Sequence, residues 1–310
     1  MATTADLGFV GLGIMGAPMA GHLLRAGHRL TVHSRTRSKA DPLLAAGAAW
    51  GHSPADVAAR CGVLFINVTD SPDVEQVLFG PGGAADALRP GSVVVDFSTI
   101  SPDATRDFAR RLAARQVHLL DAPVTGGDVG ARNATLTIMV GGPAEALERV
   151  RPLLDCVGKR IVHVGPSGAG QALKACNQVL CAANMIGVCE ALLLARRSGL
   201  DLNHALDTLG SGAGGSWAWT NLGRRIIDGD LKPAFMIRLI QKDLRIVQDA
   251  AQRAGLPLPG TALAQQLFRA VEAEPGGGAL GTQAMIRAYE RLAGAGRAPE
   301  PGCPQPGGPA

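Results

Sequence analysis

The stretch LGFVGLGIMGAPMA, residues 7–20, is the strongest indication of the fold of this chain. A short apolar strand runs directly into a G-x-G-x-x-G turn and a helix follows at once, which is the arrangement that binds dinucleotides in parallel α/β sheets. The three glycines permit a tight turn, a close approach of backbone to a pyrophosphate, and close packing of helix on strand. The free N–H groups at the start of the helix then hold phosphates. We therefore expect the whole turn to bind a cofactor: Gly11, Leu12, Gly13, Ile14, Met15 and Gly16.

Strand and helix signals alternate through the first half of the chain. Short β-branched runs predict strands at 7–10, 29–33, 63–68, 92–96, 118–121, 135–140 and 160–164. Helical segments fall between them, at 16–26, 55–61, 71–78, 102–115 and 143–154. After Val164 the strands stop, and helices are predicted at 168–197, 203–209, 217–228, 239–254 and 261–273.

This order of elements predicts an α/β fold, with a Rossmann-type doubly wound sheet followed by an all-α second domain. We expect an NADP-binding domain at residues 1–165 and an all-α domain for substrate binding and oligomerisation at 166–296. Residues 297–310 are too rich in Pro and Gly to pack, and we expect a disordered tail there.

Composition excludes several classes of protein. The net charge is only +4 and the arginines are spread along the chain, which indicates neither a nucleic-acid partner nor a membrane surface. The six cysteines show no metal-ligand spacing, so no metal is expected. We expect their thiols to be reduced and the protein to be cytoplasmic. The sequence shows no secretory signal, and residues 179–195, the stretch nearest to a membrane span, are interrupted by Asn184 and Glu190.

The end of the second predicted strand indicates which dinucleotide binds. An NAD site usually places Asp or Glu there to accept from the ribose 2′-OH, but this chain has no acid before Asp41. Arg35 can instead pair with a 2′-phosphate, with hydroxyls from Ser34 and Thr36 assisting. The sequence therefore predicts a preference for NADP(H) over NAD(H).

Lys174 is the most informative residue of the second half. Lys174 and Glu190 are the only charged residues in the stretch 165–195. A stretch this apolar predicts a helix that is buried on most sides. Burial disfavours the charged form of lysine, so such a residue is paired, solvated or used. Asn177 and Gln178 follow at i+3 and i+4 and share its helix face. If the bound dinucleotide transfers hydride to a carbonyl carbon, negative charge grows on the carbonyl oxygen and a positioned acid must give it a proton. We expect Lys174 to be that acid, with Asn177 orienting the substrate or the lysine and Gln178 supporting it.

Four motifs in order resemble the β-hydroxyacid dehydrogenase family, which includes 3-hydroxyisobutyrate dehydrogenase, tartronate semialdehyde reductase and the glyoxylate/succinic semialdehyde reductases. They are GLGIMGAPMAGHLLRAGH (11–28), DAPVTGGDVGARNATLTIMVGG (121–142), GAGQALKACNQ (168–178) and QKDL (241–244). The resemblance implies that Lys174 is the general acid/base. It also implies that Thr125, Gly126 and Gly127 bind the substrate carboxylate. The other implied contacts are with the cofactor, from Val68, Thr69, Ser98 and Thr99, and with cofactor or substrate, from Lys242.

The chain departs from the family pattern at three places. Thr125 stands where the family usually has Ser, and Asn133-Ala134 replaces a usual Gly. Asn177-Gln178 replaces Asn-Asn, a form typical of the tartronate semialdehyde reductase branch. The hydroxyl of Thr125 keeps the chemistry of serine, so we expect its role to be the same.

The function predicted from these features is reduction of a short carboxylated aldehyde or ketone by NADP(H), with tartronate semialdehyde, succinic semialdehyde or glyoxylate as candidate substrates. The alternatives are a 3-hydroxyisobutyrate dehydrogenase that works in the oxidative direction and a non-catalytic dinucleotide-binding module. Imine reductases share the fold but carry another residue at the lysine position, so Lys174 argues against them. By analogy with the family, and from the apolar surface of the long helix, we expect a homodimer or homotetramer.

Overall fold

The computed structural model describes residues 4–294, which form two compact units. The first unit contains the described residues up to Val179 together with Lys242–Pro257, and the second contains Leu180–Gln241 and the described residues from Leu258 onward. The predicted tail at 297–310 lies outside the described residues. The predicted domain boundary after residue 165 stays a prediction.

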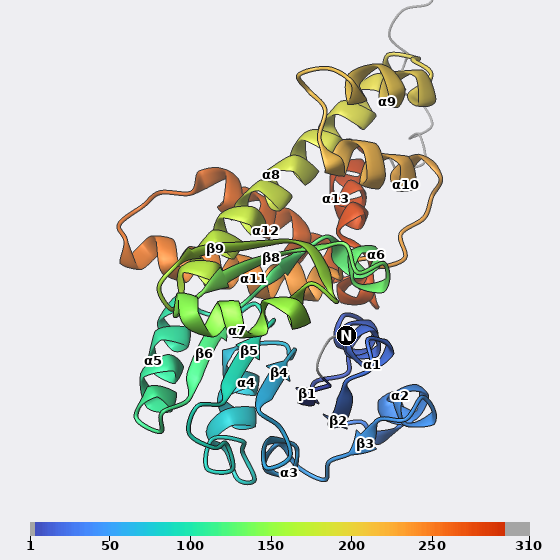
Figure 1. Cartoon of the computed structure of the whole chain (residues 1–310). Helices are drawn as coiled ribbons and strands as arrows, with labels where there is room; N and C mark the ends of the chain where they lie inside the picture. The colour runs from blue at the N-terminus through green and yellow to red at the C-terminus, as the bar shows by residue number, and fades with distance from the viewer. Residues whose placement is uncertain (1–3, 295–310) are drawn as a thin grey trace, which may run out of the picture. The chain divides into compact units, whose positions relative to one another are not determined.

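The first unit is built on one nine-stranded sheet (Figure 1). Its strands are β1 (Asp6–Val10), β2 (Arg29–His33), β3 (Ala49–Trp50), β4 (Val63–Ile66), β5 (Val93–Asp96), β6 (His118–Asp121), β7 (Val124–Thr125), β8 (Leu136–Gly141) and β9 (Gly158–Gly165). The order is β3-β2-β1-β4-β5-β6-β8-β7, with β9 paired to β8. Strands β1 to β6 are parallel, whereas β8 runs antiparallel to β6 and β7. The predicted Rossmann-type sheet is confirmed.

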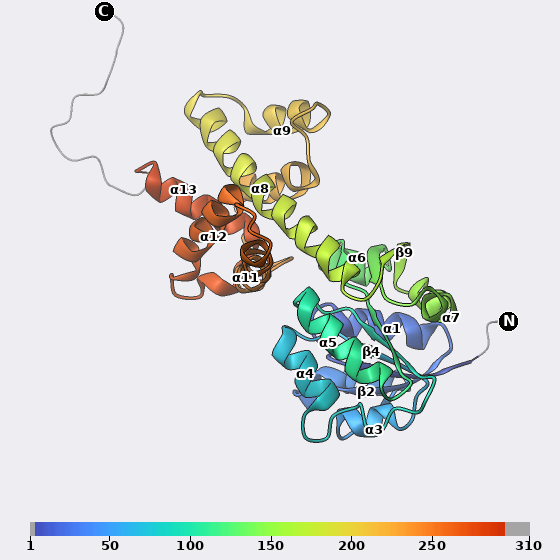
Figure 2. The same ribbon diagram turned by 90° about the vertical axis from the view of Figure 1, so that its left-hand side faces the viewer.

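Side chains that alternate along each strand give the sheet two apolar faces. In β4, for example, Phe65 belongs to one buried cluster while Leu64 and Ile66 belong to the other. The Phe65 face is covered by α1 (Gly16–Arg25), α2 (Asp41–Ala45), α6 (Gly127–Arg132) and α7 (Ala144–Leu154). The opposite face is covered by α3 (Pro54–Ala58), α4 (Ser71–Phe79) and α5 (Pro102–Ala113), drawn together in Figure 2. The strand order reverses between β1 and β4, and ligands of open α/β sheets bind at such a switch point.

The rest of the chain is helical, as expected. The helices are α8 (Ala169–Arg197), α9 (Leu202–Gly210), a π-helical segment at Ala218–Gly223, α10 (Arg224–Ile227), α11 (Ile237–Arg253), α12 (Pro259–Glu272) and α13 (Ile286–Leu292). Buried Phe268, Met285 and Ile286 form part of the core of the second unit. The indole of Trp219 donates to the Leu206 carbonyl at 2.9 Å, which joins the π-helical segment to α9.

Helix α8 corrects two expectations. It is not buried on most sides within this chain, because Leu173, Leu180 and Leu194 are exposed. Among the described residues it is also the one helix long and apolar enough to cross a membrane, by length and composition alone, a test that core helices also pass. Its first turns nonetheless hold buried polar side chains, including those of Gln171 and Lys174.

Candidate active site

The nucleotide turn is shaped by its glycines. Gly11 adopts a φ of 102°, and a Cβ there would lie 2.1 Å from the Asn67 carbonyl oxygen of the neighbouring strand end. A Cβ on Gly16 would lie 2.0 Å from the Gly11 carbonyl oxygen, so only glycine lets α1 begin this close to β1. A Cβ on Gly13, in contrast, would meet no atom within 4 Å. The space beside Gly13 is therefore open to a ligand.

The start of α1 suits an anionic group. No side chain caps the helix, and its first turn contains no acidic residue. The N–H groups of a first helical turn have no partner within the helix, and the helix dipole places partial positive charge there. The open face at Gly13 and this uncapped start fit the pyrophosphate of a dinucleotide.

The residues at the end of β2 form the predicted adenosine-phosphate end of the site. Ser34 is buried. The Arg35 side chain is 83% exposed, and its Nη1 lies 3.1 Å from the Asp73 carboxylate. Arg37 is engaged differently, because it stacks over the Trp50 ring at 4.6 Å and pairs with Asp41. Of the two arginines, Arg35 has the more accessible guanidinium.

The loops after β4 and β5 are tied to each other at the carboxyl edge of the sheet. The Val68 N–H donates to the Ser98 hydroxyl at 2.9 Å, and the Ser98 N–H donates to Oδ1 of Asp96 at 2.9 Å. Asp96 is fully enclosed, and burial raises its pKa to about 7, although hydrogen bonds from Ser98 act in the opposite direction. Thr69 and Thr99 directly follow Val68 and Ser98 in the sequence, after the carboxyl ends of β4 and β5, where open sheets bind ligands.

Lys174 lies within the first unit and is buried, with 8% of its surface exposed. Its Nζ donates to the Val124 carbonyl oxygen at 2.9 Å. Val124 and Thr125 form β7, and the next two residues, Gly126 and Gly127, adopt φ angles of 129° and 64°. The lysine therefore hydrogen-bonds to the residue that directly precedes Thr125, Gly126 and Gly127, the residues predicted to bind the substrate carboxylate.

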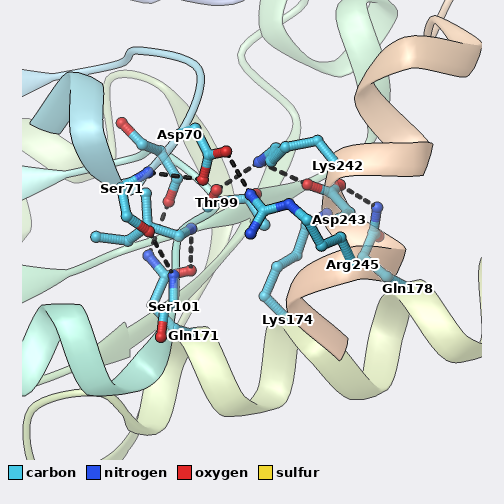
Figure 3. Close-up of polar contacts among 12 residues, drawn as sticks. Asp70, Ser71, Thr99, Ser101, Gln171, Lys174, Gln178, Lys242, Asp243 and Arg245 are labelled. Carbon is cyan, nitrogen blue, oxygen red and sulfur yellow. Dashed lines mark hydrogen bonds and ion pairs between the residues drawn. The ribbon is translucent and has the colours of Figure 1, made fainter. Parts of the chain in front are cut away.

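Polar side chains connect α8 with α11 (Figure 3). Nδ2 of Asn177 donates to Oε1 of Gln178 at 2.7 Å, and Nε2 of Gln178 donates to Oδ2 of Asp243. The other Asp243 oxygen lies 2.7 Å from Nζ of Lys242, which also donates to the Thr99 carbonyl oxygen. The buried Asp243 carboxylate is therefore shared by an ammonium and an amide, and it fixes both predicted site residues.

Four buried polar residues that surround Lys174 and the loop at Thr99 had no role predicted from the sequence: Asp96, Asp121, Gln171 and Asp243. Asp121 ends β6 and caps the start of α8, because its two carboxylate oxygens accept from Gly168 N–H at 2.8 Å and Gln171 N–H at 2.9 Å. Burial raises the pKa of Asp121, opposed by these backbone hydrogen bonds. An acidic residue at the end of an apolar strand was the available signal for both Asp96 and Asp121, since such a group needs a buried partner.

The comparisons with known proteins agree with this architecture. The NAD binding domain of 6-phosphogluconate dehydrogenase matches residues 6–165, and the NAD-binding domain of NADP-dependent 3-hydroxyisobutyrate dehydrogenase matches residues 168–289. The chain belongs to the β-hydroxyacid dehydrogenase family. It is an NAD(P)-dependent oxidoreductase, which argues against the non-catalytic binding module.

Individual relatives match over nearly their whole length. The chain is 43% identical to 2-hydroxy-3-oxopropionate reductase of Escherichia coli over 287 residues, which cover 93% of this chain and 98% of that protein. It is 44% identical to an uncharacterised oxidoreductase of Synechocystis over 281 residues, which cover 90% and 96%. Among solved structures, Mycobacterium tuberculosis 3-hydroxyisobutyrate dehydrogenase with L-serine aligns with a TM-score of 0.85 at 31% identity, covering 93% of this chain and 99% of that one.

Proposed function

We propose that this oxidoreductase uses NADP(H) to reduce a short aldehyde or ketone that carries a carboxylate, with tartronate semialdehyde, succinic semialdehyde and glyoxylate as the candidate substrates. The observation that carries the proposal is the hydrogen bond from Lys174 to Val124, which holds a buried ammonium beside the Thr125–Gly127 turn. The similarity to 2-hydroxy-3-oxopropionate reductase supports a substrate of this size.

Each part of the site has a task in this reaction. The nicotinamide, when bound, supplies the hydride that adds to the carbonyl carbon. The Thr125 hydroxyl and the N–H groups of Gly126 and Gly127 bind the carboxylate, which fixes the substrate next to β7. Lys174 gives the carbonyl oxygen a proton as negative charge develops there, so the product is the hydroxy acid. In the oxidative direction the neutral amine takes the same proton back.

The remaining residues hold this arrangement in place. Asn177 orients the substrate or the lysine, and Gln178 supports it from its bond to Asp243. Lys242 pairs with Asp243 and donates to the Thr99 carbonyl oxygen, so a remaining N–H of its ammonium can donate to the cofactor or the substrate beside Thr99. Arg35, with Ser34 and Thr36, favours NADP(H) because its guanidinium can pair with a 2′-phosphate.

Steady-state kinetics test the proposal. We expect turnover of at least one of tartronate semialdehyde, succinic semialdehyde and glyoxylate, with a higher kcat/KM for NADPH than for NADH. The same enzyme should be assayed with 3-hydroxyisobutyrate and both oxidised cofactors, because the second candidate function is a 3-hydroxyisobutyrate dehydrogenase acting oxidatively. That candidate is favoured by the structural similarity to 3-hydroxyisobutyrate dehydrogenases. Absence of turnover with all four acids would reject both functions.

We also propose that the enzyme is a homodimer or homotetramer that covers part of α8. Leu180 and Leu194 are 64% and 70% exposed on this helix, and exposed apolar surface of this kind is typical of subunit interfaces. Sedimentation velocity at micromolar concentration should give a single species larger than 31.8 kDa. A monomer would contradict the proposal. The cytoplasmic location and the absence of nucleic-acid and membrane partners stay predictions from the sequence.

A further inference from the structure

Gln171 is a buried residue whose side-chain amide hydrogen-bonds to the backbone on both sides of Thr99. Its side chain is 1% exposed. Its Nε2 donates to the Ser98 carbonyl oxygen at 2.7 Å, and its Oε1 accepts from the Ile100 N–H at 3.1 Å (Figure 3). One amide thus satisfies a donor and an acceptor of the loop after β5, in the way that a neighbouring strand would.

The same loop after β5 is held by further hydrogen bonds from other residues. Asp96 accepts from the Ser98 N–H, the Ser98 hydroxyl accepts from Val68 N–H, and the Thr99 carbonyl oxygen accepts from Lys242. Thr99 therefore stands between two residues whose backbone groups are fixed. A loop held in this way presents Thr99 in one position relative to the sheet.

The backbone of Gln171 fixes the other partner, α8. Its N–H donates to Asp121, which also accepts from Gly168, so the first turn of α8 is attached to the end of β6. Lys174 follows three residues later on the same helix face, about 4.5 Å further along the axis. The Lys174 ammonium then reaches Val124 on β7.

We propose that Gln171 is a positioning residue, which sets the distance between the cofactor loop at Thr99 and the proton donor Lys174. The inference rests on the proposed function, in which Lys174 protonates the substrate, and on the predicted contact of Thr99 with the cofactor. Hydride and proton must reach two bonded atoms of one carbonyl group, so the separation of their donors has to be held closely. A misplacement of about 1 Å lowers a rate by about 100-fold, even when the altered residue does not touch the reacting atoms.

The test replaces the amide without removing its volume. In Gln171→Met the loop loses both hydrogen bonds, while the Thr125–Gly127 turn is untouched. We expect kcat to fall about 10- to 100-fold, with the KM of the acid substrate changed less than about twofold and the dissociation constant of NADPH raised about tenfold, since the change reaches Thr99 and not the carboxylate site. With NADPH deuterated at the transferred position, the isotope effect on kcat should increase, because hydride transfer becomes more rate-limiting.

Gln283→Met is the matched control. Gln283 is also a fully buried glutamine, and its Nε2 donates to the carbonyl oxygens of Asp230 and Lys232 at 3.0 and 2.9 Å. Both variants lose buried hydrogen bonds and should have lower melting temperatures. Only Gln171→Met should change kcat, the isotope effect and NADPH affinity when rates are expressed per folded enzyme.

Gln171→Asn keeps the test decisive if the methionine variant does not fold. Asparagine retains the amide but is one methylene shorter, so it cannot reach both Ser98 and Ile100, and we expect the same pattern. Normal kcat in a folded Gln171 variant, or an equal loss in Gln283→Met, would overturn the inference. If the wild-type enzyme turns over none of the acids, the proposed function fails by itself. The NADPH affinities of the Gln171 and Gln283 variants then still decide whether Gln171 positions the cofactor loop.

Discussion

The nucleotide turn and the lysine site are built in opposite ways. The turn consists of six consecutive residues, Gly11–Gly16, and presents backbone N–H groups in a conformation that glycine makes possible. The lysine site is made of side chains from separate segments. The contact between Lys242 and Thr99, for example, joins residues that are 143 positions apart in the sequence. A site made of backbone groups therefore depends on local conformation, whereas a site made of side chains depends on how the distant segments of the sheet and helices pack together.

The largest effect should come from removing the ammonium of Lys174. We expect Lys174→Ala to lower kcat about 10²- to 10⁴-fold, the range typical of a general acid. NADPH affinity should change little, because the nucleotide turn does not contain the lysine. Fluorescence titration with NADPH and steady-state kinetics measure the two quantities separately. Lys159→Ala, which removes an exposed lysine on β9, is the control. Retained turnover in Lys174→Ala would mean that another group protonates the substrate.

Two glycine substitutions should separate folding from binding in the nucleotide turn. Gly16→Ala puts a methyl group 2.0 Å from a backbone oxygen, and we expect it to lower stability by about 1–3 kcal/mol. Gly13→Ala meets no protein atom, so its melting temperature should stay unchanged while its dissociation constant for NADPH rises about tenfold or more, since the methyl occupies the space for the pyrophosphate. Thermal unfolding and cofactor titration give both values. Equal NADPH binding by Gly13→Ala and wild type would place the pyrophosphate elsewhere.

The side-chain site should also show its buried acid in the pH dependence of stability. The pKa of Asp96 is about 7 in the folded protein against 3.8 in the unfolded chain, so the folded state binds more protons between about pH 4 and pH 7. The contribution of Asp96 to the free energy of unfolding therefore falls as pH rises through this window.

Asp96→Asn keeps an oxygen that can accept from the Ser98 N–H but cannot ionise. Its stability relative to wild type should increase with pH, by up to about 1.4 kcal/mol for each pH unit between the two pKa values. Urea unfolding of both proteins at pH 5 and pH 8 measures this difference. A constant difference across these values would show that Asp96 ionises normally. Because the two proteins differ only at residue 96, the titration of Asp121 affects the stability of both and largely cancels in their difference.

The smallest effect is expected at the exposed end of the cofactor site. Arg35→Ala should raise the KM of NADPH about fivefold and leave that of NADH unchanged, because an exposed guanidinium–phosphate pair contributes about 1 kcal/mol. Arg37→Ala should change neither value as much, since Arg37 is already engaged with Trp50 and Asp41. Equal losses for NADPH and NADH in Arg35→Ala would exclude a contact specific to the 2′-phosphate.

Prediction from the sequence succeeded where elements carried their own signal. All seven predicted strands are present, with ends that differ by at most two residues. The two-residue strands β3 and β7 were missed because they are too short to show alternation. Helix α6 was missed because it begins in the glycine pair that follows Thr125. Ala134, in a place where the family has glycine, adopts a φ of 53°, so the turn there persists despite the strain.

Surface and core were harder to separate on α8. Of its three cysteines, only Cys189 is buried, whereas Cys176 and Cys181 are exposed. An apolar helix is equally apolar whether its partner is the same chain or another subunit. Periodicity alone therefore could not distinguish a helix of the core from one that leaves an apolar face exposed.

The nucleotide turn, the order of the longer strands and helices, and the helix face that carries Lys174 could all be read from the sequence, because they depend on backbone preferences and on spacing within a few residues. The partners of this helix came from the three-dimensional packing: Val124 for the ammonium, Asp121 for the backbone at the helix start, Ser98 for Gln171, and Asp243 for Gln178. These partners come from distant segments, and their contacts exist only once the sheet order and the packing of α8 and α11 are set.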